Sequence, residues 1–208
     1  MKRMITSLLA IFAFSAISHA QTPEKSDKQD VRFRVKSGLN ISNISDDSDS
    51  KSKAGFHIGA AAEIFVTDKF SIQPELQYSM QGAKGKNDLL IEGVRVTNMQ
   101  VNMNYINVPV MAKYYVAEGF SIQAGPQLGF LVKAESTADL RLGNEKTSIT
   151  NNIKSMTNKV DFGLNFGVAY DLSFGLFFDA RYNLGLTDIL KDADGQHRVF
   201  QLGVGYKF

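Results

Sequence analysis

The stretch HRVFQLGVGYKF, residues 197–208, alternates large apolar side chains with small or polar ones. The apolar positions are Phe200, Leu202, Val204, Tyr206 and Phe208. Successive side chains of a β-strand point to opposite faces of its sheet, so a period of two residues is typical of strands. The stretch therefore predicts a strand with one apolar face and one small or polar face.

The same alternation recurs in seven further segments of about ten or more residues. They are residues 31–42, 56–66, 70–81, 105–115, 120–133, 160–171 and 176–186. One face of these segments is nearly free of charge, whereas the other carries charges of both signs. The charged positions are Arg32, Arg34, Lys36, Glu63, Glu75, Lys113, Asp161, Asp171, Asp179, Arg181 and Lys207. Outside the N-terminal segment no stretch has a helical period, so the sequence predicts an all-β fold.

The connections between these segments alternate between short and long. The short connections are residues 67–69, 117–119 and 172–175, and the long ones are residues 43–55, 82–104, 134–159 and 187–196. This order predicts an eight-stranded antiparallel up-and-down β-barrel with both ends of the barrel domain at the short-turn end. Two long connections are expected to rise as hairpins, which turn at Glu92-Gly93 and Gly143-Asn144.

Three prolines, Pro74, Pro109 and Pro126, fall within the predicted strands. Proline cannot donate to a β-ladder and is normally confined to edge strands and bulges. A closed barrel has no edge, so we expect local bulges at these three positions.

The direction of the apolar face separates two kinds of eight-stranded barrel. A soluble lipocalin-like barrel would turn this face inward, but eight strands enclose a space only just wide enough to be filled by side chains. A narrow interior of paired charges and glycines, with the bulky residues facing lipid, fits the sequence better. Aromatic residues near the strand ends are expected to form two interfacial girdles. They are Phe70, Tyr114, Phe120, Tyr170 and Phe208 by the short turns, and Phe56, Tyr78, Phe130, Phe162 and Phe200 by the long loops.

Residues 1–20 have the layout of a secretory signal peptide. Lys2 and Arg3 precede an apolar run, and small residues at Ser18 and Ala20 predict cleavage before Gln21. We expect an N-terminal polar segment at 21–30 and the barrel domain at 31–208. Loss of the two signal cations leaves 21 basic and 21 acidic residues, which gives no reason to expect a nucleic-acid partner. The chain has no cysteine, so neither a disulfide framework nor a lipid-modified cysteine is available.

The order and spacing of several motifs resemble the small outer-membrane β-barrel domain family that includes the PorT-like proteins. The motifs are FRVKSGLNIS, FSIQPELQYSMQG, YINVPVMAKYYVAEGFSIQAGPQLGFLV, VDFGLNFGVAYDL, FFDARYNLGLTDI and FQLGVGYKF. The resemblance implies a barrel in the outer membrane of a Gram-negative cell. It also implies that the alternating last strand, ending in Phe208, is read by the barrel assembly machinery. The family has no single activity, and a role in protein secretion belongs to some members only.

The sequence offers no catalytic, cofactor-binding or metal-binding residues that we would assign. His57 and His197 are the only histidines after the signal peptide, and Asp188, Asp192 and Asp194 lie near His197 in sequence. The acidic stretches 45–53 and 192–195 do not complete a calcium-binding loop. The leading interpretation is a non-enzymatic barrel with a filled interior, whose external loops contact a partner or whose barrel supports an envelope assembly. The alternatives are a barrel-embedded envelope enzyme and a soluble ligand-binding barrel.

Overall fold

A computed structural model describes residues 30–45, 50–86, 88–91, 93–143, 145–191 and 194–208. The expected signal peptide and most of the polar segment at 21–30 lie outside these residues. The described chain forms ten strands. They are β1 (Val31–Ile44), β2 (Ser50–Thr67), β3 (Phe70–Gly85), β4 (Leu89–Ile91), β5 (Val94–Ala117), β6 (Phe120–Leu142), β7 (Glu145–Asn152), β8 (Val160–Asp171), β9 (Leu176–Gly185) and β10 (His197–Lys207).

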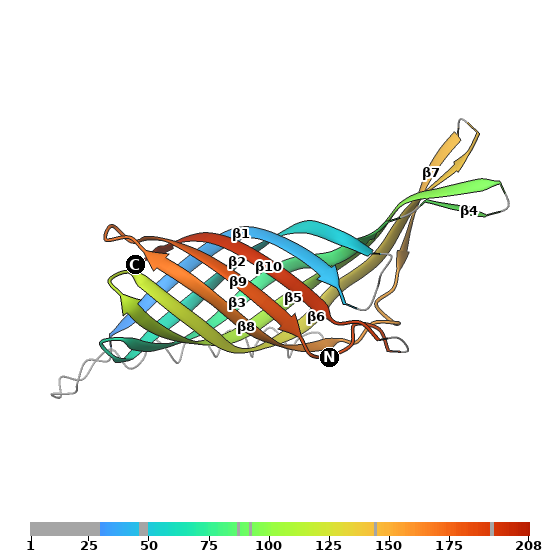
Figure 1. Cartoon of the computed structure of the whole chain (residues 1–208). Coiled ribbons are helices and arrows are strands. Elements are labelled where there is room, and N and C mark those ends of the chain that lie inside the picture. The colour runs from blue at the N-terminus through green and yellow to red at the C-terminus, as the bar shows by residue number, and fades with distance from the viewer. Residues whose placement is uncertain (1–29, 46–49, 87, 92, 144, 192–193) are drawn as a thin grey trace, which may run out of the picture.

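Eight of these strands close into a barrel (Figure 1). Around the ring the order is β1, β2, β3, β5, β6, β8, β9 and β10, and β10 returns to pair with β1. All of these pairings are antiparallel, as expected when consecutive strands run up and down and are joined at alternate ends of the barrel. The predicted eight-stranded antiparallel barrel is therefore confirmed, and β4 and β7 are additional strands outside the ring.

Tight turns join the strands at one end, which we call the short-turn end, and the longer connections lie at the other, the long-loop end. Gly119 and Gly175 sit in two of the tight turns with φ angles of 73° and 96°. Residues other than glycine rarely adopt these left-handed backbone angles, so glycine permits the chain to reverse there. The strands at the ends of the barrel domain, β1 and β10, begin and finish at the short-turn end, as expected (Figure 1).

The apolar face of every ring strand points outward. Phe33, Leu39 and Ile58 are 59%, 65% and 56% exposed, whereas their chain neighbours Arg34, Asn40 and His57 are buried. Burying charged side chains while exposing aliphatic ones is the reverse of the arrangement in a water-soluble protein. This orientation contradicts a lipocalin-like interior and gives the barrel a hydrocarbon-facing exterior.

The prediction of bulges at the three prolines is wrong. Within the described strands the pairing register is unchanged across Pro74, Pro109 and Pro126. Beyond Pro74 and beyond Pro109 the ladder instead skips two residue pairs before pairing resumes in the same register. A missing N–H removes a hydrogen bond without requiring an extra residue in the strand, which explains why the barrel tolerates these prolines. The register shifts lie between Ser52 and His57, Phe65 and Thr67, Thr97 and Gln100, Asn104 and Tyr105, and Tyr115 and Ala117.

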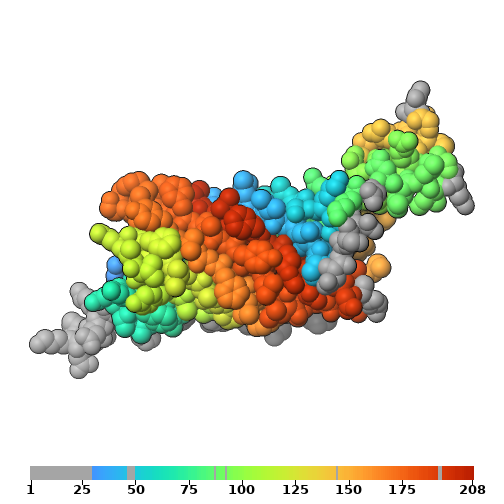
Figure 2. All heavy atoms as spheres, in the orientation of Figure 1, coloured from blue at the N-terminus to red at the C-terminus, as the bar shows by residue number. Residues whose placement is uncertain are grey.

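Strands β5 and β6 continue well beyond the barrel and carry two further hairpin partners. β4 pairs with β5, β7 pairs with β6, and β5 and β6 remain paired with each other as far as Arg95 and Arg141. Together the outer part of these strands makes a four-stranded projecting sheet that stands clear of the barrel (Figures 1 and 2). The two predicted hairpins are confirmed by the pairing of their strands, although Glu92 and Asn144 lie outside the described residues.

Within the described residues, no helix has the length and apolar character needed to cross a membrane.

Candidate functional site

The middle of the barrel interior holds two cations and two carboxylates in one ion-pair network. The Arg181 guanidinium donates hydrogen bonds of 2.7 and 2.8 Å to the two oxygens of Glu75, and its Nε lies 2.9 Å from Asp179. The Lys36 ammonium lies 3.0 Å from Asp179 and 3.3 Å from Glu75. All four side chains are at least nine-tenths buried. Their formal charges cancel, and the bidentate guanidinium–carboxylate geometry is a strong, directional form of pairing.

A second network occupies the interior near the short-turn end. Arg34 pairs with Glu63 at 2.8 Å and also with Asp171, while Lys113 lies 2.9 Å from Glu63. The Tyr115 hydroxyl donates to Glu63 at 2.7 Å. Beyond this network an open cavity of about 740 Å³ faces the short-turn end, and Tyr115 and Asp171 are among its lining residues.

The interior at the long-loop end is apolar instead. Met103, Tyr105, Leu131, Ala134 and Ile189 form a buried hydrophobic cluster, which we call the mouth cluster. Four of these residues come from β5 and β6, whereas Ile189 comes from the connection between β9 and β10. That connection therefore folds inward over the barrel mouth rather than extending away from it.

The two histidines considered in the sequence lie apart from each other inside the barrel. One ring nitrogen of His57 is 2.8 Å from the side-chain oxygen of Asn40. His197 packs edge-on against Tyr105 with a nitrogen 3.1 Å from the tyrosine hydroxyl, so it supports the mouth cluster. Both histidines are at most 1% exposed. Neither partner is visible in the sequence pattern, since Asn40 and Tyr105 are 17 and 92 positions away.

Asp188, one of the acidic residues near His197 in sequence, hydrogen-bonds within the loop that contains it. Asp188 accepts hydrogen bonds from the backbone of Gly195 at 3.2 Å and from the side chain of Gln196 at 2.7 Å. Among the described residues no group of three histidine, cysteine or acidic side chains could hold a metal ion. Asp192 lies outside the described residues, as do 46–49 of the acidic stretch 45–53.

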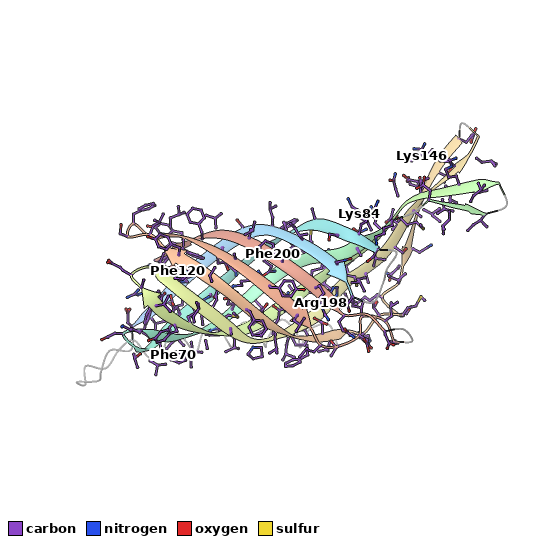
Figure 3. The ribbon with its side chains drawn as sticks, in the orientation of Figure 1. Phe70, Lys84, Phe120, Lys146, Arg198 and Phe200 are labelled. Atoms are coloured by element: carbon purple, nitrogen blue, oxygen red, sulfur yellow. The ribbon has the colours of Figure 1, made fainter. Side chains whose placement is uncertain are left out.

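The projecting sheet has two unlike faces. The strand register places Arg95 opposite Arg141 and Arg141 opposite Lys146, so three cations form one row across β5, β6 and β7. The neighbouring row faces the other way and consists of Leu89, Val96, Leu140 and Thr147. Figure 3 shows Lys146 near the tip of the projection and Lys84 where the sheet leaves the barrel. The row is not apparent in the sequence, because it arises only when the hairpins are aligned.

Asp139 is the acidic residue beside the cation row. Its carboxylate accepts hydrogen bonds from Ser148 at 2.5 Å and Asn98 at 2.7 Å, and it lies 2.9 Å from the ammonium of Lys146. These contacts hold the pKa of Asp139 well below its usual range, with the Ser148 hydrogen bond as the largest cause. The carboxylate is therefore ionised and already committed to β7 and to Asn98.

Comparison with known proteins agrees with this fold. The family model for the outer membrane protein beta-barrel domain matches residues 19–191. The attachment invasion locus protein Ail of Yersinia pestis, solved in complex with the heparin analogue sucrose octasulfate, aligns with a TM-score of 0.50 and 15% identity over 86% of this chain and 99% of that one. Neisserial surface protein A aligns with a TM-score of 0.48 and 14% identity over 86% and 97%. A search of curated proteins found no match.

The family match covers most of the chain, and the structure supplies the matching physical features. A closed ring leaves no unpaired strand edge for lipid to contact, and its exterior is apolar on all eight strands. In such barrels the short turns face the periplasm and the longer loops face the outside. The chain belongs to the outer membrane protein β-barrel domain family and resides in the outer membrane.

Proposed function

We propose that this protein is a non-enzymatic outer-membrane barrel with a closed interior, which presents its projecting sheet to a partner outside the cell. The observation that carries the closed interior is the central network of Lys36, Glu75, Asp179 and Arg181, whose charges cancel across the lumen. An ion crossing this point would have to separate paired charges that are shielded from water, at a high electrostatic cost. The mouth cluster adds an apolar layer on the outer side.

The non-enzymatic character is supported by the placement of the candidate chemical groups. His57 and His197 are buried, and each lies within hydrogen-bonding distance of one neutral side chain, Asn40 and Tyr105 respectively. Neither of these contacts is the link between a nucleophile and an acid that a catalytic triad requires. A general base must reach the proton that it abstracts from a substrate, and these rings are enclosed by the barrel wall.

Assembly and processing complete the proposal. We propose cleavage of residues 1–20, a polar segment at 21–30, and delivery of the barrel to the outer membrane by the barrel assembly machinery, which recognises β10. Support for the last step comes from the alternation along β10, where Phe200, Leu202, Val204 and Tyr206 all face outward. The quoted motifs favour a place near the PorT-like members of the family, without the secretion role that some of them have.

Planar-bilayer recording of the refolded protein tests the closed interior. The expected result is the absence of a large, stable pore at neutral pH. Arg181→Ser removes the guanidinium that spans Glu75 and Asp179, and we expect more frequent brief openings in that variant than in the parent protein. Lys159→Ser serves as the control, because it also removes one positive charge but does so at an exposed position on the outer rim. A steady porin-like conductance in the parent protein would contradict the closed interior.

A further inference from the structure

We propose that Arg95, Arg141 and Lys146 form a binding row for a sulfated or phosphorylated polysaccharide outside the cell. The inference rests on the proposed function, because it names the chemistry of the partner that the projecting sheet contacts. The arrangement of these three cations costs stability in the free protein. Like charges directly opposite each other in an antiparallel pair are destabilising, and here Arg95 faces Arg141 while Arg141 faces Lys146.

The charges in this row are poorly compensated within the protein. Lys146 pairs with Asp139, but its side chain is still 48% exposed. Neither Arg95 nor Arg141 forms an ion pair with any described residue, and both lie on the exposed surface. Asp139 itself is held by Ser148 and Asn98. The row therefore keeps two uncompensated guanidinium groups, which are suited to bidentate recognition of sulfate and phosphate oxygens.

The row lies too far along the strand to serve the headgroups of the protein's own membrane. On β6 the last outward apolar residue of the barrel wall is Val132, which is 48% exposed, and Arg141 follows nine residues later. Nine residues of extended strand cover roughly 30 Å. The projecting sheet leaves the barrel at an angle and carries Lys146 close to its tip (Figure 3). This placement favours an anion in the surroundings of the cell over a lipid phosphate.

The residues next to the row favour a saccharide over a protein as the carrier of that anion. In the next row towards the barrel the same face holds Asp139 between Thr97, which is buried, and Ser148, whose hydroxyl donates to Asp139. The row after it holds Thr137 and Thr150. The exposed hydroxyl groups of Thr137 and Thr150 can donate to and accept from sugar hydroxyls. Protein interfaces instead rely on aromatic and aliphatic anchors, and on this face the described residues supply only Leu90, at the edge of the row. Adjacent strands are about 4.8 Å apart, so the three cations span about 10 Å. Closely spaced anionic groups on a sugar polymer fit that length.

Binding to dextran sulfate, measured on the full-length protein in detergent or nanodiscs, tests the proposal. The parent protein should bind dextran sulfate, should not bind neutral dextran, and should bind poly-L-glutamate at least tenfold more weakly. The variant Arg95→Gln with Arg141→Gln should lose at least tenfold in affinity and show a weaker dependence on salt. The matched control, Lys69→Gln with Lys159→Gln, removes the same charge away from the row and should bind like the parent protein.

Three patterns of binding would overturn the assignment of the row to a polysaccharide, and a complete absence of binding would be a fourth. The three patterns are unchanged binding by the arginine double variant, an equal loss in the lysine control, or poly-L-glutamate binding as tightly as dextran sulfate, which would assign the surface to acidic proteins. Heat-modifiable gel mobility of every variant reports the folded barrel separately. If all variants are folded and non-conducting but none binds dextran sulfate, the row is wrong while the proposed barrel function stands.

Discussion

The barrel interior and the cation-bearing face of the projecting sheet are both formed by the polar sides of strands whose other side is apolar. Their charges are arranged in opposite ways. In the interior, Arg181 and Lys36 are enclosed with Glu75 and Asp179, so each charge has a buried partner on another strand. In the projecting sheet, Arg95 and Arg141 are aligned with each other and face water. Closure of the ring is the cause of the difference, because it brings distant strands face to face, whereas an open sheet can pair only neighbours.

The two regions therefore differ in how much unpaired charge they can tolerate. A buried charge without a partner is strongly destabilising, so the interior must be internally neutral for the barrel to fold. Water screens the projecting sheet, so its charges can remain uncompensated without a large cost to folding.

The largest expected difference in the free energy of unfolding is between a variant that lacks one interior charge and a variant that lacks one charge of the projecting sheet. Arg181→Met leaves Glu75 and Asp179 with only Lys36 and should lower the free energy of unfolding by roughly 3 to 5 kcal/mol. Lys146→Met removes an exposed partner of Asp139 and should leave the unfolding of the barrel unchanged. Urea titration of both variants in lipid vesicles makes the measurement. Equal losses in the two variants would mean that the interior is not shielded as the burial of Arg181 indicates.

The next effect compares apolar residues of the two regions. Leu164→Arg or Phe178→Arg puts a charge against hydrocarbon, which costs roughly 2 to 4 kcal/mol near the bilayer midplane. Leu142→Arg adds the same charge to the projecting sheet, where water surrounds it, and should be nearly neutral. Refolding into vesicles, followed by heat-modifiable gel mobility, ranks the three variants.

Interior variants provide the control for this second comparison. Asn165 and Asn183 are hydrogen-bonded to each other inside the barrel at 3.1 Å. Asn165→Ser and Asn183→Ser keep a hydrogen-bonding group there and should be milder than either arginine substitution. If they were the more damaging pair, the assignment of the exterior to lipid would fail.

The smallest effect concerns pH and the projecting sheet. Because its hydrogen bonds lower the pKa of Asp139 in the folded sheet, the carboxylate stabilises β7 at every pH above its unfolded pKa of about 4. That stabilisation is lost only as the pH falls below this value towards the folded pKa. We expect backbone NMR signals of β7 to be constant from about pH 7 to 5 and to shift under more acidic conditions. Asp139→Asn should abolish the acid transition, and its persistence in that variant would assign it to another group.

The sequence located all eight ring strands, but it made several of them too short at the long-loop end. Predicted segments at 105–115 and 120–133 correspond to β5 and β6, which run from Val94 to Ala117 and from Phe120 to Leu142. Beyond the membrane, apolar residues are no longer required on one face, so the alternation weakens while the strands continue. The prediction of bulges at the prolines was wrong for a related reason, since a local sequence rule cannot reveal that the surrounding ladder keeps its register. The aromatic girdles remain a prediction.

By itself the sequence determined that the chain is a barrel and which residues face lipid, because a period of two over ten residues fixes the face of every side chain. It also determined that the interior contains charges of both signs. Only the tertiary structure decided how those charges combine. Arg181 meets Glu75 across 106 positions, and Arg95 stands beside Arg141 without an acid between them. Such neighbours are set by the register and closure of the strands, which depend on all the pairings in the sheet together and not on the local pattern of any one segment.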